Sequence, residues 1–386
     1  MKAICKSVAR GRLGFELMRE SRRIKFKLGG NALAEVGSIS WPFDTESVCR
    51  AFNYSGFQAG VIKGNSGCYG SMLNYNITCF FPFHKLADDR SPFFCVPEIN
   101  WPLLSRHQEI LCHEIDSEIY GEDCDAVSVI LECLKEGYIY MKVDLYYIPG
   151  TQFYLVSHIV HDVLIVGWNS LNAEISLCAG FDHKGEYVLG TVGWVMLSLS
   201  IRSAADRRGD VEAMRKSTYS IRYIKNRCEE SKVDLRLVRS QLADSFKGTY
   251  SACEYIADGW RPDFRTTRSN GLFGVRVYEI LSVYFEHKVY NKDVIDLRVG
   301  RALWEHKALM LERLISCSRI GLNVRKQVIS LYKELCDSAW CMHVELVKRH
   351  MEGCLTSPDS LQNGNIEKLQ AKETEALRIV LEDNPL

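Results

Sequence analysis

The sequence predicts an α+β domain over residues 1–203, followed by an all-α domain over residues 204–386. Strand-like segments follow a helix-like one between residues 125 and 192, which is typical of α+β domains. After residue 204, charged and apolar residues interleave at helical spacing instead. A protein of 386 residues with 47% hydrophobic content is long and apolar enough for two domains with cores of their own.

The first domain is expected to contain one helix and then a run of strands. Residues 127–134 carry apolar side chains at helical spacing, and Gly137 stands where a C-cap is expected. Residues 138–147 alternate and are rich in Tyr, Ile and Val, which predicts a strand. Residues 161–168 are apolar on both faces, which predicts a central strand. Two further strands and a turn are expected at 174–181, 186–192 and 169–173.

The second domain is expected to be a set of helices. Gly321 is expected to end one of them, and Asn323 is expected to cap the next. The periodicity predicts the four main helices over 275–287, 293–319, 323–350 and 365–382.

Charged residues stand beside large apolar ones within the second of these helices. They form the runs Asp296-Leu297-Arg298 and Trp304-Glu305-His306-Lys307. Arg301 and Glu305 are four residues apart and therefore share a helical face. A ladder of ion pairs on the surface explains this pattern, and a contact with another domain or a partner is the alternative.

Composition excludes several classes of protein. The formal net charge is zero, so no overall field attracts nucleic acid or an anionic membrane. Apolar runs such as 163–168 are far shorter than the roughly 20 residues that cross a bilayer. The basic N-terminus lacks the apolar core of a signal peptide, so we expect a cytoplasmic protein. The 15 cysteines contain no Cys-x-x-Cys pair, which argues against a zinc ribbon or a thioredoxin-type centre. We expect no bound metal and no cofactor.

A histidine on the central strand is the main candidate for chemistry. Side chains alternate along a strand, so His161 and His158 point to opposite faces and cannot chelate one metal together. His161 is the candidate general base. Asp182, at the end of the next strand, is the candidate group that orients its ring, with Asn169 as a weaker one. The alternative is that His161 is a hydrogen-bonded core residue.

A histidine on one strand with an acid after the next is how papain-like folds hold the general base. Such an enzyme needs a cysteine thiolate as nucleophile, usually at a helix N-terminus. Cys68, in Ser66-Gly67-Cys68-Tyr69-Gly70, and Cys79, in an aromatic run, are the two candidates. Another cysteine, or none, remains open.

These segments resemble proteins related to the butirosin biosynthesis protein H N-terminal domain, which are often encoded in bacterial natural-product clusters. The resemblance implies a papain-like α+β domain in which His161 and Asp182 keep their roles. It also implies transfer of an aminoacyl group from a carrier-protein thioester to an amine. The motifs that carry it are Tyr147-Ile148-Pro149, His158-x-x-His161-Asp162, Leu164-Ile165-Val166-Gly167, Gly180-Phe181-Asp182, Phe273-Gly274-Val275-Arg276-Val277-Tyr278, Asp296-Leu297-Arg298 and Trp304-Glu305-His306-Lys307.

The expected function is therefore that of a thiol acyltransferase in the biosynthesis of a non-ribosomal peptide or related antibiotic. Its expected partners are an acyl or peptidyl carrier protein and a small-molecule amine acceptor, without nucleic acid or membrane. One alternative is a catalytically inactive papain-like protein that docks synthetases through its helical half. The other alternative is a cysteine peptidase.

Overall fold

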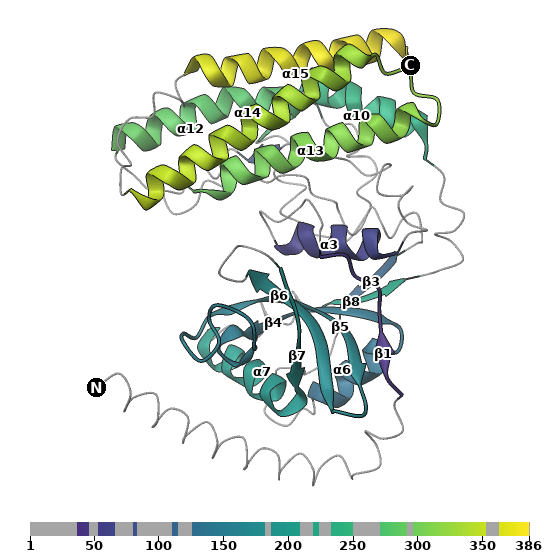
Figure 1. The fold of residues 1–386 in the computed structure, drawn as a ribbon, viewed down its shortest axis with the longest axis vertical. Coiled ribbons are helices and arrows are strands. Elements are labelled where there is room, and N and C mark those ends of the chain that lie inside the picture. Colours follow the sequence, from purple (N-terminus) through teal and green to yellow (C-terminus); the bar gives the residue numbers. More distant parts are fainter. Residues whose placement is uncertain are drawn as a thin grey trace. The chain divides into compact units, whose positions relative to one another are not determined.

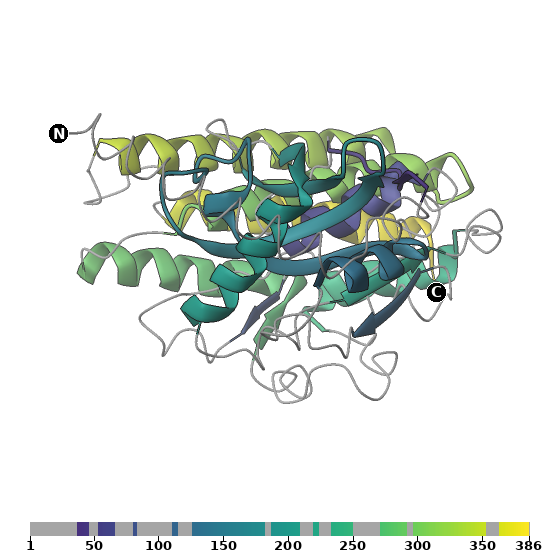
Figure 2. The ribbon, with the colours of Figure 1, turned by 90° about the horizontal axis from the view of Figure 1, so that it is seen from below.

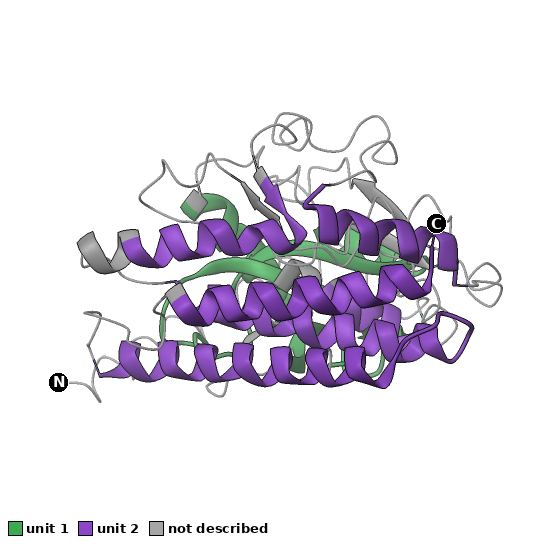
Figure 3. Ribbon diagram, turned by 90° about the horizontal axis from the view of Figure 1, so that it is seen from above, with its two compact units in different colours: residues 1–45, 110–224 green, residues 46–109, 225–386 purple. Residues whose placement is uncertain are grey.

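The computed structural model describes residues 37–45, 53–65, 80–82, 110–114, 126–181, 187–208, 219–223, 233–249, 271–291, 296–352 and 363–385. Its helices and strands are labelled in Figure 1. An antiparallel sheet and a separate group of helices confirm the mixed α+β composition. The protein divides into two compact units, coloured in Figure 3: unit 1 contains Met1–Thr45 and Ile110–Ile224, and unit 2 contains Glu46–Glu109 and Lys225–Leu386.

Unit 1 is built on a seven-stranded sheet whose pairs are all antiparallel. The strands lie in the order β3-β8-β4-β5-β6-β7, and β1 pairs with β5. Their bounds are β1 (Ile39–Ser40), β3 (Ile110–Glu114), β4 (Gly137–Asp144), β5 (Val160–Asn169), β6 (Glu174–Phe181), β7 (Tyr187–Gly193) and β8 (Tyr219–Tyr223).

The central strand is β5, as the sequence predicts. Val163 and Ile165 are buried on one face, and Leu164 and Val166 are buried on the other. Strand β4 is shorter than predicted. It ends at Asp144, whose carboxylate accepts a hydrogen bond from the backbone N–H of Tyr146 and so starts the 3₁₀ turn η3 (Leu145–Tyr147).

Helices α6 (Ala126–Leu134) and α7 (Trp194–Arg208) pack against the same face of the sheet (Figure 2). Helix α6 matches the predicted one, but Gly137 begins β4 instead of capping the helix. The core between helices and sheet consists of apolar residues from both layers. It includes Val127, Ile130, Leu131, Leu134, Ile139, Met141, Val143, Val163, Ile165, Ile175, Leu177, Val192, Leu197 and Ile201.

Strand β1 is held unusually close to β5. The backbone N–H of Trp41 donates to Val166 O over 2.8 Å, and its indole N–H donates to Leu134 O over 2.8 Å. A Cβ on Gly167 would lie 2.6 Å from Ile39 O. The position therefore requires glycine, because β1 occupies the space of a side chain.

The compact units differ from the predicted division at residue 203/204. Strand β8 follows that boundary in sequence but pairs with β4, Tyr138 lying opposite Ile221, so it belongs to the sheet. Conversely, α3 (Asn53–Gly64) and β2 (Phe80–Pro82) precede the predicted boundary in sequence but belong to unit 2 with the C-terminal helices.

Unit 2 is mainly helical. The four predicted helices are present with shifted ends, and a short antiparallel pair of strands adds to them, so unit 2 is not purely α. The remaining bounds are α10 (Leu235–Lys247), β9 (Gly271–Phe273), η5 (Gly274–Arg276), α12 (Val277–Asn291), α13 (Arg298–Ser318), α14 (Lys326–Met351) and α15 (Asn363–Asp383).

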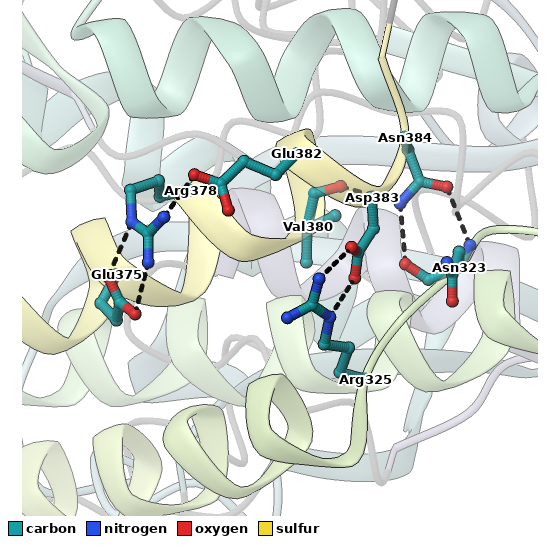
Figure 4. A network of polar contacts seen from close by, with 8 residues as sticks. All are labelled: Asn323, Arg325, Glu375, Arg378, Val380, Glu382, Asp383 and Asn384. Carbon is teal, nitrogen blue, oxygen red and sulfur yellow. Dashed lines mark hydrogen bonds and ion pairs between the residues drawn. The ribbon is translucent and has the colours of Figure 1, made fainter.

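The connection between α13 and α14 is fixed by the end of α15 (Figure 4). Gly321 has φ +116°, which favours glycine where the backbone leaves α13. Asn323 does not cap α14, because that helix begins only at Lys326. Its backbone N–H donates to Asn384 Oδ1 over 2.8 Å, and its C=O accepts from Asn384 Nδ2 over 2.7 Å. Neighbouring ion pairs join Arg325 to Asp383, and Arg378 to Glu375 and Glu382.

The charged run in α13 is buried, so its interpretation as a surface ladder is wrong for three of its members. Glu305, His306 and Lys307 are 1–2% exposed. The Lys307 ammonium lies 2.5 Å from a carboxylate oxygen of Glu373 on α15. An isolated charge in an apolar interior is strongly unfavourable, so these buried charges are stabilised by lying next to each other.

Candidate functional site

The candidate site is centred on Asp144 at the end of β4. Its side chain is completely buried. One carboxylate oxygen lies 2.7 Å from His158 Nδ1. The other accepts hydrogen bonds from the backbone N–H groups of Tyr146, over 3.1 Å, and Ile159, over 3.2 Å. Asp144 therefore joins the end of β4 to the residues that enter β5.

Helix α7 supplies further donors to the same residue. Ser203 Oγ donates to the carboxylate over 2.5 Å, and Arg207 Nε lies 3.4 Å from it. Ser200 Oγ donates to the backbone carbonyl oxygen of Asp144 over 2.7 Å. A buried carboxylate without such partners would be strongly destabilising, and here each of these neighbours is a donor.

His158 is held by Asp144 on one edge and by aromatic rings around it. Its ring stacks on Tyr146 with centroids 4.1 Å apart and an interplanar angle of 15°. The ring of Tyr147 approaches at 6.0 Å and 63°. The His158 side chain is 31% exposed, so solvent reaches part of it. With Nδ1–H donating to the carboxylate, the neutral ring has its lone pair on Nε2, which is the arrangement of a general base.

His161 lies on β5 opposite Val143 and is partly buried. Its Nδ1 accepts a hydrogen bond from the backbone N–H of Asp162 over 2.8 Å. For a neutral ring this bond places the proton on Nε2, which is then a potential donor. Asp162 faces the other way and pairs with Lys142. The two histidines thus differ in tautomer, and it is His158 that contacts Asp144.

The other residues predicted for the site fare differently. Asp182, Cys68 and Cys79 lie outside the described residues. Asn169 ends β5, and its side chain accepts from Leu171 N in the turn. It is eight residues from His161 along the strand, a distance of about 26 Å at 3.3 Å per residue. Asn169 therefore does not orient His161.

The five cysteines whose side chains are described are all free thiols. Burial raises the pKa of four of them, Cys133, Cys178, Cys317 and Cys336, the last to about 11. Acidic neighbours raise the pKa of Cys133 further, and cationic neighbours only partly offset burial at Cys317 and Cys336. Cys341 is exposed. None of the four buried or half-buried thiols therefore has the lowered pKa of a catalytic nucleophile.

Two kinds of feature are missing from the described part of the protein. It holds no group of three or more His, Cys, Asp or Glu side chains that could bind a metal ion. No helix among the described residues is long and apolar enough to cross a membrane.

Sequence reasoning missed Asp144. The available signal is an acid directly after the strand residues Tyr140-Met141-Lys142-Val143, followed by the aromatic pair Tyr146 and Tyr147. A charged residue that ends a strand is usually a turn residue. Only the fold, which brings His158 next to Asp144, identifies the role of Asp144.

A scan against protein-family models finds no match to this protein, and a search of curated proteins finds no similar one.

Proposed function

We propose that the protein is a papain-like thiol acyltransferase that moves an acyl or aminoacyl group from a carrier-protein thioester to an amine. His158 is its general base and acid, and Asp144 orients and stabilises the His158 ring. One observation carries this proposal: a completely buried carboxylate lies 2.7 Å from a histidine that is still 31% exposed. A histidine that is held by a buried acid and remains partly exposed can act as the base that activates a nucleophile.

The reaction would run in two halves. His158 Nε2 takes the proton of the cysteine thiol, and the thiolate attacks the thioester carbonyl carbon. The tetrahedral intermediate collapses, the carrier sulfur leaves with the proton from His158, and the acyl group stays on the cysteine. The amine then attacks the enzyme thioester, and His158 takes its proton and returns it to the departing cysteine sulfur. Asp144 stabilises the imidazolium formed in each half.

The surroundings of Asp144 support this role over that of a simple structural anchor. A loop anchor needs only the backbone donors of Tyr146 and Ile159. Here Ser203 and Arg207 also hold the carboxylate from α7, which fixes the oxygen that faces His158. The sequence resemblance supplies the substrate class, a carrier-bound acyl thioester and an amine.

The nucleophile is a cysteine whose side chain lies outside the described part. Cys68 and Cys79 are the candidates from sequence, and Cys124 joins them because it stands two residues before α6 in the sequence. A helix N-terminus lowers the pKa of a thiol. Cys→Ser variants of these three, each tested for loss of the acyl-enzyme by intact mass, identify the residue.

The test is acyl transfer from a carrier-bound thioester to an amine by the wild type and three variants. His158→Ala is expected to lose roughly 10²–10⁴-fold in kcat, with partial rescue by added imidazole. Asp144→Asn is expected to lose a comparable or larger factor, since the amide favours the wrong tautomer. His161→Ala serves as the matched control and is expected to stay within about tenfold of the wild type.

The possible results separate the alternatives. Wild-type turnover in His158→Ala removes His158 from the mechanism. A loss confined to His161→Ala returns the role of base to His161. Transfer to water and peptides but not to amines indicates a cysteine peptidase. Absence of turnover by the wild type, with carrier binding retained, indicates an inactive docking protein.

A further inference from the structure

Tyr146 is fixed by both polar groups of its backbone. Its N–H donates to Asp144 Oδ1 over 3.1 Å, and its C=O accepts from the N–H of Leu155 over 2.9 Å. The side-chain ring of Tyr146 stacks on His158. The stacking therefore depends on two anchors, one of which is the carboxylate that also binds His158.

Leu155 donates to Tyr146 from an unfavourable backbone conformation. Its φ is +54°, one of two such values at non-glycine residues in the described ranges. A bulky residue in the left-handed region is strained, and strain of this kind persists where the surroundings impose it. The surroundings here are a tightly bonded loop: Thr151 Oγ1 donates to Ile148 O over 3.1 Å, and Val156 N donates to Phe153 O over 3.0 Å.

We infer that Tyr146 is a positioning residue for His158 and that the backbone N–H of Leu155 holds Tyr146 in place. One hydrogen bond to Asp144 fixes Nδ1 but leaves the imidazole plane free to tilt about that contact. The stacked Tyr146 ring on one side and the edge of Tyr147 remove this freedom. Nε2 then keeps a single direction, which general-base catalysis requires.

The packing part of this inference is independent of the reaction, and its catalytic part rests on the proposed function. Two readouts keep them apart. The first is the chemical shift of the His158 ring protons, observed by NMR on the full-length protein labelled at histidine. A ring stacked on tyrosine experiences an upfield ring-current shift. The second is the kcat of acyl transfer, compared with KM.

Tyr146→Leu is expected to abolish the upfield shift and to lower kcat roughly 10–100-fold with KM little changed, since small misplacements of reacting groups have effects of this size. Tyr146→Phe keeps the ring and is expected to retain both the shift and kcat. Circular dichroism of both variants verifies that they fold. An unchanged His158 shift in Tyr146→Leu overturns the packing role. A lost shift with wild-type kcat overturns the catalytic role.

Leu155 provides a second matched pair. Leu155→Gly keeps the N–H and accepts a positive φ, so the stacking shift is expected to persist. Leu155→Pro removes the donor and cannot adopt this φ, so the shift is expected to disappear. Loss of the upfield His158 shift in the folded glycine variant, or its retention in the proline variant, contradicts the role of Leu155 in holding Tyr146 in place. If the wild type transfers no acyl group at all, the proposed function fails while the NMR results still decide the packing inference.

Discussion

Breaking the buried ion pair between Lys307 and Glu373 should destabilise the helical unit more than any surface change. Lys307 is 1% exposed and Glu373 is 3% exposed. Glu373 accepts from the Lys307 ammonium over 2.5 Å and from the Tyr278 hydroxyl over 2.8 Å. Removing the ammonium leaves a carboxylate buried without its cation. Such losses amount to about 3–5 kcal/mol of the free energy of unfolding.

The assay is urea unfolding of the full-length protein followed by far-UV circular dichroism. Lys307→Met keeps most of the side-chain volume and isolates the charge. In the double variant Lys307→Met/Glu373→Gln neither charge of the pair is buried and Tyr278 keeps an acceptor, so most of the loss should be recovered. Lys372→Met is the matched control. It removes an exposed pair between α15 and Glu334, and its effect should stay within about 1 kcal/mol.

The dependence on pH gives a second test of the same pair. Burial alone raises the pKa of Glu373, but the charges of Lys307 and His306 and the hydrogen bonds from Lys307 and Tyr278 together outweigh burial and hold this pKa below its ordinary value of 4.5. A lowered native pKa contributes stability that is present above the ordinary pKa and is lost as pH falls through the native one. The advantage of the wild type over Glu373→Gln should therefore shrink below about pH 4.5. A Lys307→Met variant no less stable than Lys372→Met would refute the reasoning.

Three further outcomes are expected. Asn384→Ala removes three hydrogen bonds that tie the end of α15 to itself and to the segment before α14, and should lower the free energy of unfolding by about 1–3 kcal/mol in the same urea assay. Gly167→Ala should lower it by about 1–3 kcal/mol because β1 occupies the space of the added methyl, whereas Gly193→Ala, with no atom within 4 Å, should be near neutral. Alkylation mapped by mass spectrometry should reach the exposed Cys341 in the native protein and Cys336, whose pKa burial raises to about 11, mainly after unfolding.

The sequence predicts an element well where a single hydrophobic pattern determines whether the segment is a strand or a helix. Strand β5 is apolar on both faces, and only a central strand buries both. Helix α14 has a long stretch of helical periodicity and lies close to where it is expected. Strand β8 escapes prediction because five residues carry little periodicity, and its place depends on pairing with β4, about 80 residues earlier.

The site illustrates the same limit at the level of single residues. His158 and His161 are equivalent in a strand pattern, and alternation says only that they face opposite ways. Their difference comes from Asp144, which stands 14 residues before His158. Asp144 caps the 3₁₀ turn η3, which begins the connection from β4 to β5. The burial of Glu305, His306 and Lys307 is likewise hidden in the sequence, because the partner of Lys307, Glu373, is on another helix.

The measurement that tests the central claim most directly is the reactivity of the 15 cysteines toward a trace of iodoacetamide near neutral pH, mapped residue by residue. An activated thiolate beside His158 predicts one fast-reacting cysteine outside the five described, slowed in His158→Ala and unchanged in His161→Ala. Slow labelling spread over many cysteines, and indifferent to His158, would contradict the proposed enzyme.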